Sequence, residues 1–577
     1  MLLPSASDNR LSLTLLEGSL TAIAIAAAFA WPWLGNPWFA RIERAFGRLA
    51  RKQGLAVATV GFSTFLLRLA ILPLVPIPLP FVPDDFSNLL ASDTFAQGRL
   101  TNPTPAMWTH FETIHVDMNP TYGSMYFPAQ GLVMAAGKVL FGSPWFGILC
   151  TSALMCAAIC WMLQAWLPPG WALLGGFLAM LRLGLFSYWI NTYTGAGFIA
   201  GLGGALVLGA LPRLMKTVCF RYGLLLAVGI VLVAYTRPYE GMLVCLPVAA
   251  VLGHWAFFGK NRPAPAILLR RAALPVLLMI TAGAWLGYYD YRAFGSPTTL
   301  PYTVNRTTYA MAPYYVWQSQ RPEPSYRHPG MRRFYYESEM KGYSKMNSFS
   351  RFFPGTLAKF SASLLFFAGF ALLTPLIMLR RVLLDRRIRF LILCVAFVLA
   401  GLLIEIFLLP HYLAPVTAAF YAIGLQAMRH LRVWSPERKP VGLALVRLAV
   451  TLCVVLAAVR VVAMPLGFKI AEWPPSSWGN MWYGPDLFGT ERANIEFGLE
   501  QLPGKQLVFV RDSPNRYPLD QWVYNAADVD DSKVVWAWEM DAANNRELME
   551  FYGVRKAWLI KMDTQPATIS PYPLPAQ

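Results

Sequence analysis

The feature that most constrains this chain of 577 residues is a series of apolar stretches, each about as long as a helix that crosses a lipid bilayer. Such a helix needs about 20 apolar residues, because the hydrocarbon layer is roughly 30 Å thick and each residue adds about 1.5 Å. Only 14% of the residues are charged, and the mean hydropathy is +0.43. The sequence therefore predicts an α-helical polytopic membrane protein with about twelve transmembrane helices, at residues 11–33, 55–82, 145–166, 170–188, 196–212, 220–236, 241–259, 272–291, 357–379, 390–409, 412–428 and 441–463.

Clusters of Lys and Arg between these stretches predict their orientation, because short basic loops remain on the cytoplasmic side of a membrane. An even number of crossings between the first two clusters requires the shorter apolar stretch 128–142 to lie in the outer interface, and both termini are then outside. The first span carries Glu17 and could instead be peripheral. The loops expected to face the cytoplasm are 41–52, 213–221, 260–271, 380–389 and 429–439.

This basic rim accounts for most of the net charge of +18, so the charge gives no reason to expect nucleic acid as a partner. The seven cysteines all lie in or beside predicted spans, and no disulfide is expected. Cys156 and Cys160 are four residues apart on one span, but no histidine or second pair joins them. We expect them to pack as small apolar side chains.

Three segments are expected outside the membrane on the outer face, namely 83–144, 292–356 and 464–577. The chain is expected to divide into three parts. Residues 1–54 form an N-terminal helix and its basic loop, residues 55–463 form the transmembrane body with outer loops 83–144 and 292–356, and residues 464–577 form a small extracytoplasmic domain. The hydrophobic pattern of this last segment predicts a small α/β layer with a Pro-rich, loose tail over 566–577. Its expected elements are a helix at 491–502, strands at 507–511 and 534–537, a helix at 542–551 and a strand at 557–560.

Two adjacent aspartates, Asp84 and Asp85, follow directly on the predicted span 55–82. Carboxylates at the mouth of a membrane helix are costly to desolvate and are expected to meet a proton or a cation. We interpret the pair as a catalytic base site. Alternatively, one aspartate caps the amphipathic helix predicted from residue 84 to 96, where free N–H groups and the helix dipole favour a carboxylate. Capping explains one aspartate more readily than both.

Further along the same loop, four potential metal ligands occur within eight residues. They are His110, Glu112, His115 and Asp117. These residue types bind zinc or magnesium, so a divalent metal site is an alternative use of the loop. Their alternate spacing is also typical of a surface strand, and we expect no metal or other cofactor.

Four short motifs together resemble a known family. They are the acidic pair after the first core span, a helix that begins at Pro128 after aromatic residues, the sequence RPYEG at 237–241 and the sequence HYLAP at 411–415. This pattern resembles the polyprenyl-phosphate-sugar-dependent glycosyltransferases with the GT-C fold, and within them the protein mannosyltransferase and lipid A aminoarabinose transferase group. The resemblance covers roughly residues 55–430, and residues 464–577 have no clear counterpart.

The resemblance implies transfer of a sugar from a polyprenyl-phosphate donor to an acceptor hydroxyl on the extracytoplasmic face of a bacterial-type inner membrane. By position, Asp84 matches the catalytic aspartate of the family. Asp85 matches the second acidic residue, which is usually a glutamate, so this side chain is one methylene shorter. The lipid bilayer and a lipid, glycan or protein acceptor are the implied partners.

A sugar on a lipid phosphate already has a good leaving group, so one carboxylate that accepts the proton of the hydroxyl is sufficient. The leaving phosphate needs positive charge and hydrogen-bond donors. Arg237 and His411, with Tyr412 as a donor, are the candidates at outer helix ends. Arg237 can instead pair with Glu240, and His411 can be a helix cap. The remaining candidates for contacts with substrate are Asn191, Tyr193, Tyr302 and Arg306.

Two other function classes compete with a transferase. A flippase or other transporter of lipid-linked sugars would use a similar membrane body, but transporters often contain inverted repeats with polar sites at the bilayer midplane. No repeat is evident, and the polar residues cluster outside the spans. A structural subunit would leave the acidic pair without a role. Phosphate-binding loops, dinucleotide fingerprints, paired CxxC motifs and HExxH are all absent from the sequence.

Overall fold

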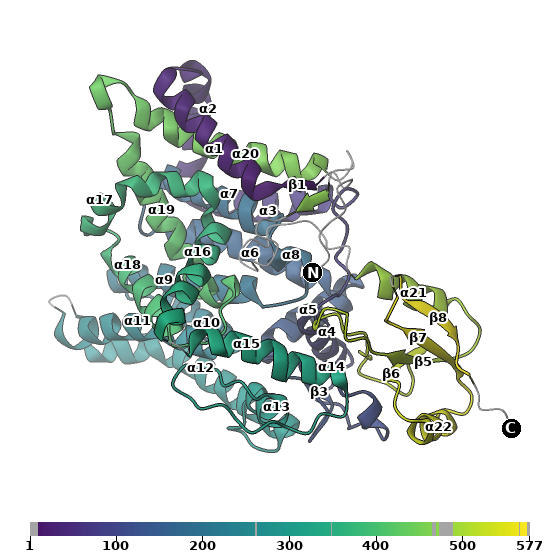
Figure 1. Cartoon of the computed structure of the whole chain (residues 1–577). Coiled ribbons are helices and arrows are strands. Elements are labelled where there is room, and N and C mark those ends of the chain that lie inside the picture. Colours follow the sequence, from purple (N-terminus) through teal and green to yellow (C-terminus); the bar gives the residue numbers. More distant parts are fainter. Residues whose placement is uncertain are drawn as a thin grey trace.

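The computed structural model describes residues 10–259, 262–347, 349–463, 469–471, 489–564 and 566–573. Most of them form a body of helices, and a smaller part with a β-sheet lies beside one side of this body (Figure 1). Each of the twelve predicted spans contains a helix. These helices are α1 (Leu13–Ala30), α3 (Gln53–Ala70), α6 (Trp145–Leu163), α7 (Pro169–Ala179), α9 (Gly197–Lys216), α10 (Phe220–Ala234), α11 (Pro238–Phe258), α12 (Pro265–Phe294), α16 (Phe349–Leu373), α18 (Arg389–Leu402), α19 (Thr417–Arg432) and α20 (Val441–Ala463).

Within the described residues, 7 helices are long and apolar enough to cross a membrane. The helices α1, α10 and α18 are also apolar but shorter. The chain is therefore a multi-pass membrane protein by length and composition of its helices, and the number of twelve spans stays a prediction. An additional helix, α2 (Asn36–Arg51), contains nearly all of the basic segment 41–52 that was expected to form a cytoplasmic loop.

The predicted span 55–82 is wrong in its second half, because α3 ends at Ala70. Residues 71–82 form turns and an extended segment that contains four prolines, and proline lacks the N–H that a helix interior requires. Arg68 is buried and donates hydrogen bonds to the carbonyls of Val75 (2.9 Å) and Pro76 (3.3 Å). The extended segment is thus held against the end of α3.

Two further spans end earlier than expected. α7 continues into a π-helix, η2 (Met180–Gly184), and stops there, while α18 stops at Leu402. Arg182 in the π-helix forms an ion pair with Glu17 of α1, at 3.2 Å between Nη1 and Oε1. The charge in the first span therefore has a buried partner on another helix.

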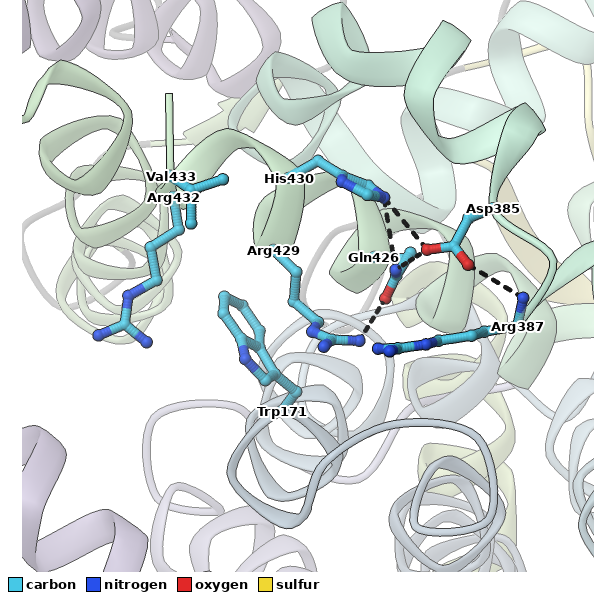
Figure 2. Close-up of a pocket in the computed structure, with 8 residues that line it drawn as sticks. All are labelled: Trp171, Asp385, Arg387, Gln426, Arg429, His430, Arg432 and Val433. Carbon is cyan, nitrogen blue, oxygen red and sulfur yellow. Dashed lines mark hydrogen bonds and ion pairs between the residues drawn. The ribbon is translucent and has the colours of Figure 1, made fainter. Parts of the chain in front are cut away.

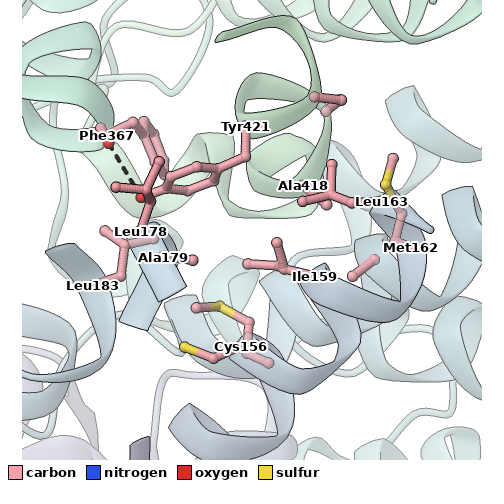
Figure 3. Packing of buried hydrophobic residues seen from close by; sticks show 14 of the residues in the cluster. Cys156, Ile159, Met162, Leu163, Leu178, Ala179, Leu183, Phe367, Ala418 and Tyr421 are labelled. Carbon is pink, nitrogen blue, oxygen red and sulfur yellow. Dashed lines mark hydrogen bonds between the residues drawn. The ribbon is translucent and has the colours of Figure 1, made fainter. Parts of the chain in front are cut away.

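The core of the body is a continuous cluster of apolar side chains from the central helices (Figure 3). Cys156 and Cys160 of α6 are fully buried in it, which confirms their expected role in packing. All seven cysteines are free thiols, as expected. The first outer loop contributes α4 (Pro83–Ala96), the strands β2 (Val116–Asp117) and β3 (Gly123–Ser124), and α5 (Pro128–Phe141).

Helices α4 and α5 approach each other closely at Gly131. A Cβ atom there would lie 2.7 Å from the Cβ of Ala91, so only glycine permits this contact. The second outer loop contains α13 (Pro301–Tyr309), α14 (Pro329–Arg332), the π-helix η3 (Arg333–Ser338) and α15 (Glu339–Met346).

The C-terminal part contains a four-stranded sheet in the order β6-β5-β7-β8. Strands β5 (Gln506–Arg511), β6 (Val534–Trp538) and β7 (Lys556–Lys561) are parallel, and helices α21 (Thr490–Glu500) and α22 (Ala542–Phe551) complete the layer. The expected loose tail is wrong at 568–571, since β8 (Thr568–Pro571) pairs antiparallel with β7. The expected domain boundary at residue 464 lies outside the described residues.

Candidate active site

Asp84 lies in the first turn of α4 and makes two short hydrogen bonds through one oxygen. Its Oδ1 atom is 2.6 Å from His115 Nδ1, and it accepts a hydrogen bond of 2.6 Å from the hydroxyl of Tyr126. His115 adopts a left-handed backbone conformation (φ 63°), which is uncommon for a residue other than glycine. The side chain of Asp84 is 23% exposed, so a substrate can reach it.

The surroundings of Asp84 favour its ionised form. Burial raises the pKa of this carboxyl. The charge and hydrogen bond of His115, the hydroxyl of Tyr126 and the charge of Arg237 together lower it by more, so the pKa of Asp84 lies below the ordinary value of 3.8. Burial and the neighbouring Asp84 raise the pKa of Tyr126 well above 10, so its hydroxyl stays protonated. Asp84 is therefore an anion at neutral pH.

Asp85 has a different environment from its neighbour. It is only 1% exposed and accepts three backbone hydrogen bonds, from Phe81 (3.1 Å), Val82 (3.3 Å) and Tyr193 (2.8 Å). Burial raises its pKa to about 7 against the effect of these N–H groups. The geometry makes Asp85 the cap of α4 and a link to Tyr193, while Asp84 faces accessible space.

Arg237 occupies the N-cap position of α11 and brings positive charge to the site. Its Nη1 atom is 3.2 Å from Glu240 Oε1, and its guanidinium lies 4.2 Å from the centre of the Tyr412 ring. Burial lowers the pKa of Arg237, but Glu240 and the tyrosines Tyr302 and Tyr412 raise it more, so it remains charged. Arg237 forms the expected pair with Glu240, and its charge also lowers the pKa of Asp84. Its contact with a donor phosphate stays a prediction.

His411 lies in the 3-10 helix η5 (Pro410–Val416) and is 2% exposed. Its Nδ1 atom is 2.6 Å from the hydroxyl of Tyr188, and Gly195 (φ 83°) packs on its ring, where a Cβ atom would lie 2.8 Å from Nδ1. Burial and the charge of Arg237 lower the pKa of His411 well below 6.5. These surroundings disfavour a positive charge at His411, and its role toward a donor phosphate stays a prediction.

Asn191 and Tyr193 face the protein interior. Asn191 Oδ1 accepts a hydrogen bond of 3.2 Å from Arg68 Nη2, and the hydroxyl of Tyr193 donates to the carbonyl of Pro78 at 3.1 Å. Both side chains are almost fully buried. They hold the extended segment 71–82 in place rather than lining open space.

Arg306 is also buried and forms an ion pair of 2.6 Å with Glu339. Its guanidinium lies 4.9 Å from the centre of the Tyr314 ring. Asn305 beside it is fully buried, with hydrogen bonds to Asp117 and Tyr335. Arg306 organises the second outer loop behind the site.

The four potential metal ligands of the first outer loop have separate partners. His110 contacts the carbonyl of Trp538, Glu112 pairs with Arg327, and His115 contacts Asp84. Asp117 accepts a hydrogen bond from Asn305. Over the described part of the chain, no group of three or more His, Cys, Asp or Glu side chains is arranged to hold a metal ion. The alternative metal site therefore finds no support in the geometry.

No family model and no curated protein matches the chain. Solved structures of GT-C proteins resemble it. ArnT from Cupriavidus metallidurans in the apo state has a TM-score of 0.46 and 14% identity, and covers 89% of this chain and 93% of its own. The Archaeoglobus fulgidus oligosaccharyltransferase tethered with an acceptor peptide has a TM-score of 0.41 and 11% identity, and covers 87% and 68%. Similarity at this level assigns neither a residue role nor an activity to this chain.

The sequence motifs did not reveal the aromatic wall of the site. The ring of Tyr302 lies 5.6 Å from that of Tyr126 and 6.1 Å from that of Tyr314. Burial raises the pKa of its hydroxyl, while the charge of Arg237 lowers it and that of Asp84 raises it. The sequence indicates Tyr302 only as a candidate for contact with substrate. The single signal in the sequence is the run of aromatic residues before Pro128, which contains Tyr126.

Proposed function

We propose that this protein is a membrane glycosyltransferase that moves a sugar from a polyprenyl-phosphate donor to an acceptor hydroxyl on the extracytoplasmic face. The observation that supports this most is that a carboxylate and a guanidinium, Asp84 and Arg237, belong to the same site. Asp84 is 23% exposed and accepts a hydrogen bond from Tyr126, whose ring packs against that of Tyr302. The charge of Arg237 contributes to the lowered pKa of Asp84, so a carboxylate and a cation serve the same site. The first group suits a base, and the second suits a phosphate.

The proposed reaction needs only these groups. The acceptor oxygen attacks the anomeric carbon of the donor while its proton passes to Asp84. The bond between that carbon and the phosphate oxygen breaks, and its electron pair remains on polyprenyl phosphate. Arg237 stabilises this anion, since guanidinium groups bind phosphate through directed, charge-assisted hydrogen bonds. Because the phosphate is a good leaving group, no general acid is required.

His115 and Tyr126 have positioning roles in this proposal. Both contact Asp84 Oδ1, so Oδ2 is left to receive the proton of the acceptor. A carboxylate whose pKa is low is a weak base, and it gains the proton late, when the attacking oxygen has become acidic. Asp85 keeps α4 in place through its backbone contacts and does not take part in proton transfer.

A reaction of purified protein in vesicles with a panel of polyprenyl-phosphate sugars tests the proposal. A transferase releases polyprenyl phosphate and yields an acceptor product that is heavier by one sugar, both visible by mass spectrometry. A transporter instead moves the intact donor between leaflets and leaves its sugar attached. That second result would assign the chain to the competing class.

A further inference from the structure

A cavity of about 490 Å³ opens where the loop before α18 meets the end of α19 (Figure 2). It is distinct from the candidate active site. Its lining combines three arginines and a histidine with a single carboxylate, an amide and two apolar side chains, namely Arg387, Arg429, Arg432, His430, Asp385, Gln426, Trp171 and Val433.

The cavity and Asp84 lie at opposite ends of the helical body. Gln53 starts α3, and its backbone carbonyl accepts a hydrogen bond of 3.0 Å from Gln164. Gln164 is the C-cap of α6, and a short connection from it leads to α7, which carries Trp171. At the other end of α3, Arg68 bonds to Asn191 and to the segment that leads to Asp84. The 18 residues of α3 separate these ends by about 27 Å, at about 1.5 Å per residue. The cavity therefore lies on the face of the basic loops.

The single carboxylate of the cavity is already engaged. Asp385 Oδ1 accepts a hydrogen bond of 2.9 Å from the backbone N–H of Arg387, and Oδ2 contacts Gln426 and, at 3.2 Å, His430. Gln426 in turn accepts a hydrogen bond of 2.7 Å from Arg429. Among the residues that the structure describes, no carboxylate forms an ion pair with the guanidinium of Arg387 or of Arg429.

The two guanidinium groups of Arg387 and Arg429 approach each other over the cavity (Figure 2). Burial and then the charge of Arg387 lower the pKa of Arg429, which is the effect of like charges placed together. The preference of basic loops for one side of a membrane requires arginines on this face. It does not require two of them to converge on one cavity with their only nearby carboxylate occupied.

We propose that this cavity binds a phosphate group between Arg387 and Arg429. Guanidinium groups are planar forks of N–H donors that match the oxygens of phosphate, and two of them together suit an anion with several oxygens. Trp171 adds an apolar wall for the part that carries the phosphate. Because the cavity opens at the end of membrane helices, this group belongs either to an anionic lipid headgroup or to a soluble phosphate.

Binding to the full-length, delipidated protein in neutral detergent tests the proposal. Native mass spectrometry counts bound phosphatidylglycerol, with phosphatidylcholine as the lipid whose choline offsets the phosphate charge, and calorimetry measures inorganic phosphate. The variants are Arg387→Gln and Arg387→Gln/Arg429→Gln. Arg386→Gln is the matched control, since Arg386 is exposed in the same loop and does not line the cavity.

We expect wild type and Arg386→Gln to bind phosphatidylglycerol or inorganic phosphate equally, and Arg387→Gln to bind at least tenfold more weakly. Saturable binding of the lipid alone identifies a headgroup site, and binding of inorganic phosphate as well identifies a soluble source. Equal losses in Arg386→Gln and Arg387→Gln would reduce the cavity to a general basic surface and overturn the proposal. So would the absence of binding of either probe to wild type. Arg387 is exposed, so its variant should fold, and an unchanged melting temperature verifies this.

Discussion

The rings of Phe86 and Tyr524 stack face to face, with centroids 4.3 Å apart and planes 5° from parallel. Phe86 lies one residue after Asp85 in α4, whereas Tyr524 belongs to the C-terminal part. The guanidinium of Arg492, also in the C-terminal part, lies 4.8 Å from the centre of the Phe86 ring. The C-terminal part therefore contacts the helix that carries the candidate base, and the backbone N–H of Ala527 also donates to Asp93 of that helix at 2.9 Å.

Replacing Tyr524 should loosen α4 and reduce activity at a distance. Tyr524→Ala removes the stacked ring, so we expect a loss of stability of about 3 kcal/mol and a lower kcat. Tyr524→Phe keeps the stack and loses only a long hydrogen bond of 3.4 Å to Ile114, so it should behave like wild type. Melting temperature and transfer rate of both variants check this. Full activity of Tyr524→Ala would show that the stack does not position α4.

The two adjacent aspartates should respond differently to the same substitution. Asp85→Asn places an amide N–H₂ against backbone N–H donors, so we expect the protein to be less stable by about 2 kcal/mol. Asp84→Asn keeps a similar shape at an accessible position and should leave the melting temperature nearly unchanged. Thermal unfolding of both variants measures the contrast. Equal melting temperatures would contradict the capping role of Asp85.

His115 should control the pH dependence of transfer. The pKa of Asp84 lies below 3.8, and a base must be unprotonated, so activity should persist as the pH falls to about 5. His115→Gln removes the interactions that lower this pKa most, and the pKa of Asp84 then rises. Activity should therefore decline at a higher pH on the acid side. Profiles of kcat/KM against pH for both proteins test this, and identical acid limbs would exclude the proposed coupling.

Arg237 should determine the affinity for the donor phosphate. Arg237→Gln removes the guanidinium while keeping a hydrogen-bond donor, and we expect kcat/KM for the donor to fall about 100-fold. Glu240→Gln retains the guanidinium and should change kcat/KM only a few-fold. Titration of the donor with each variant provides the comparison. A larger loss with Glu240→Gln than with Arg237→Gln would point to a purely structural ion pair.

Patterns within short segments were predicted well from the sequence. The helix that begins at the acidic pair and the alternation of helix and strand from 491 to 560 agree with α4 and with the elements from α21 to β7. Both depend on local periodicity and on helix starts. The two wrong predictions, at 71–82 and 568–571, also have local causes. Prolines after Ala70 prevent the hydrophobic stretch from continuing as a helix, and the Pro-rich tail forms a strand that pairs with β7.

The contacts that distinguish the two aspartates could not be predicted from the sequence. His115 reaches Asp84 across 31 residues through a left-handed backbone conformation, and Tyr193 donates to Asp85 across 108 residues. No motif encodes these distances. For the same reason, Asn191 and Tyr193 resembled sugar-binding residues in the sequence, although their buried partners are Arg68 and Pro78.

The central claim is that the carboxylate of Asp84 accepts the proton of the acceptor hydroxyl. It is tested most directly by comparing wild type and Asp84→Asn in vesicles that contain a polyprenyl-phosphate sugar and an acceptor mixture. We predict that the variant inserts and melts like wild type but releases less than about 1% as much polyprenyl phosphate, a loss of roughly 3 kcal/mol in transition-state stabilisation. Release at a rate near that of wild type would contradict the account.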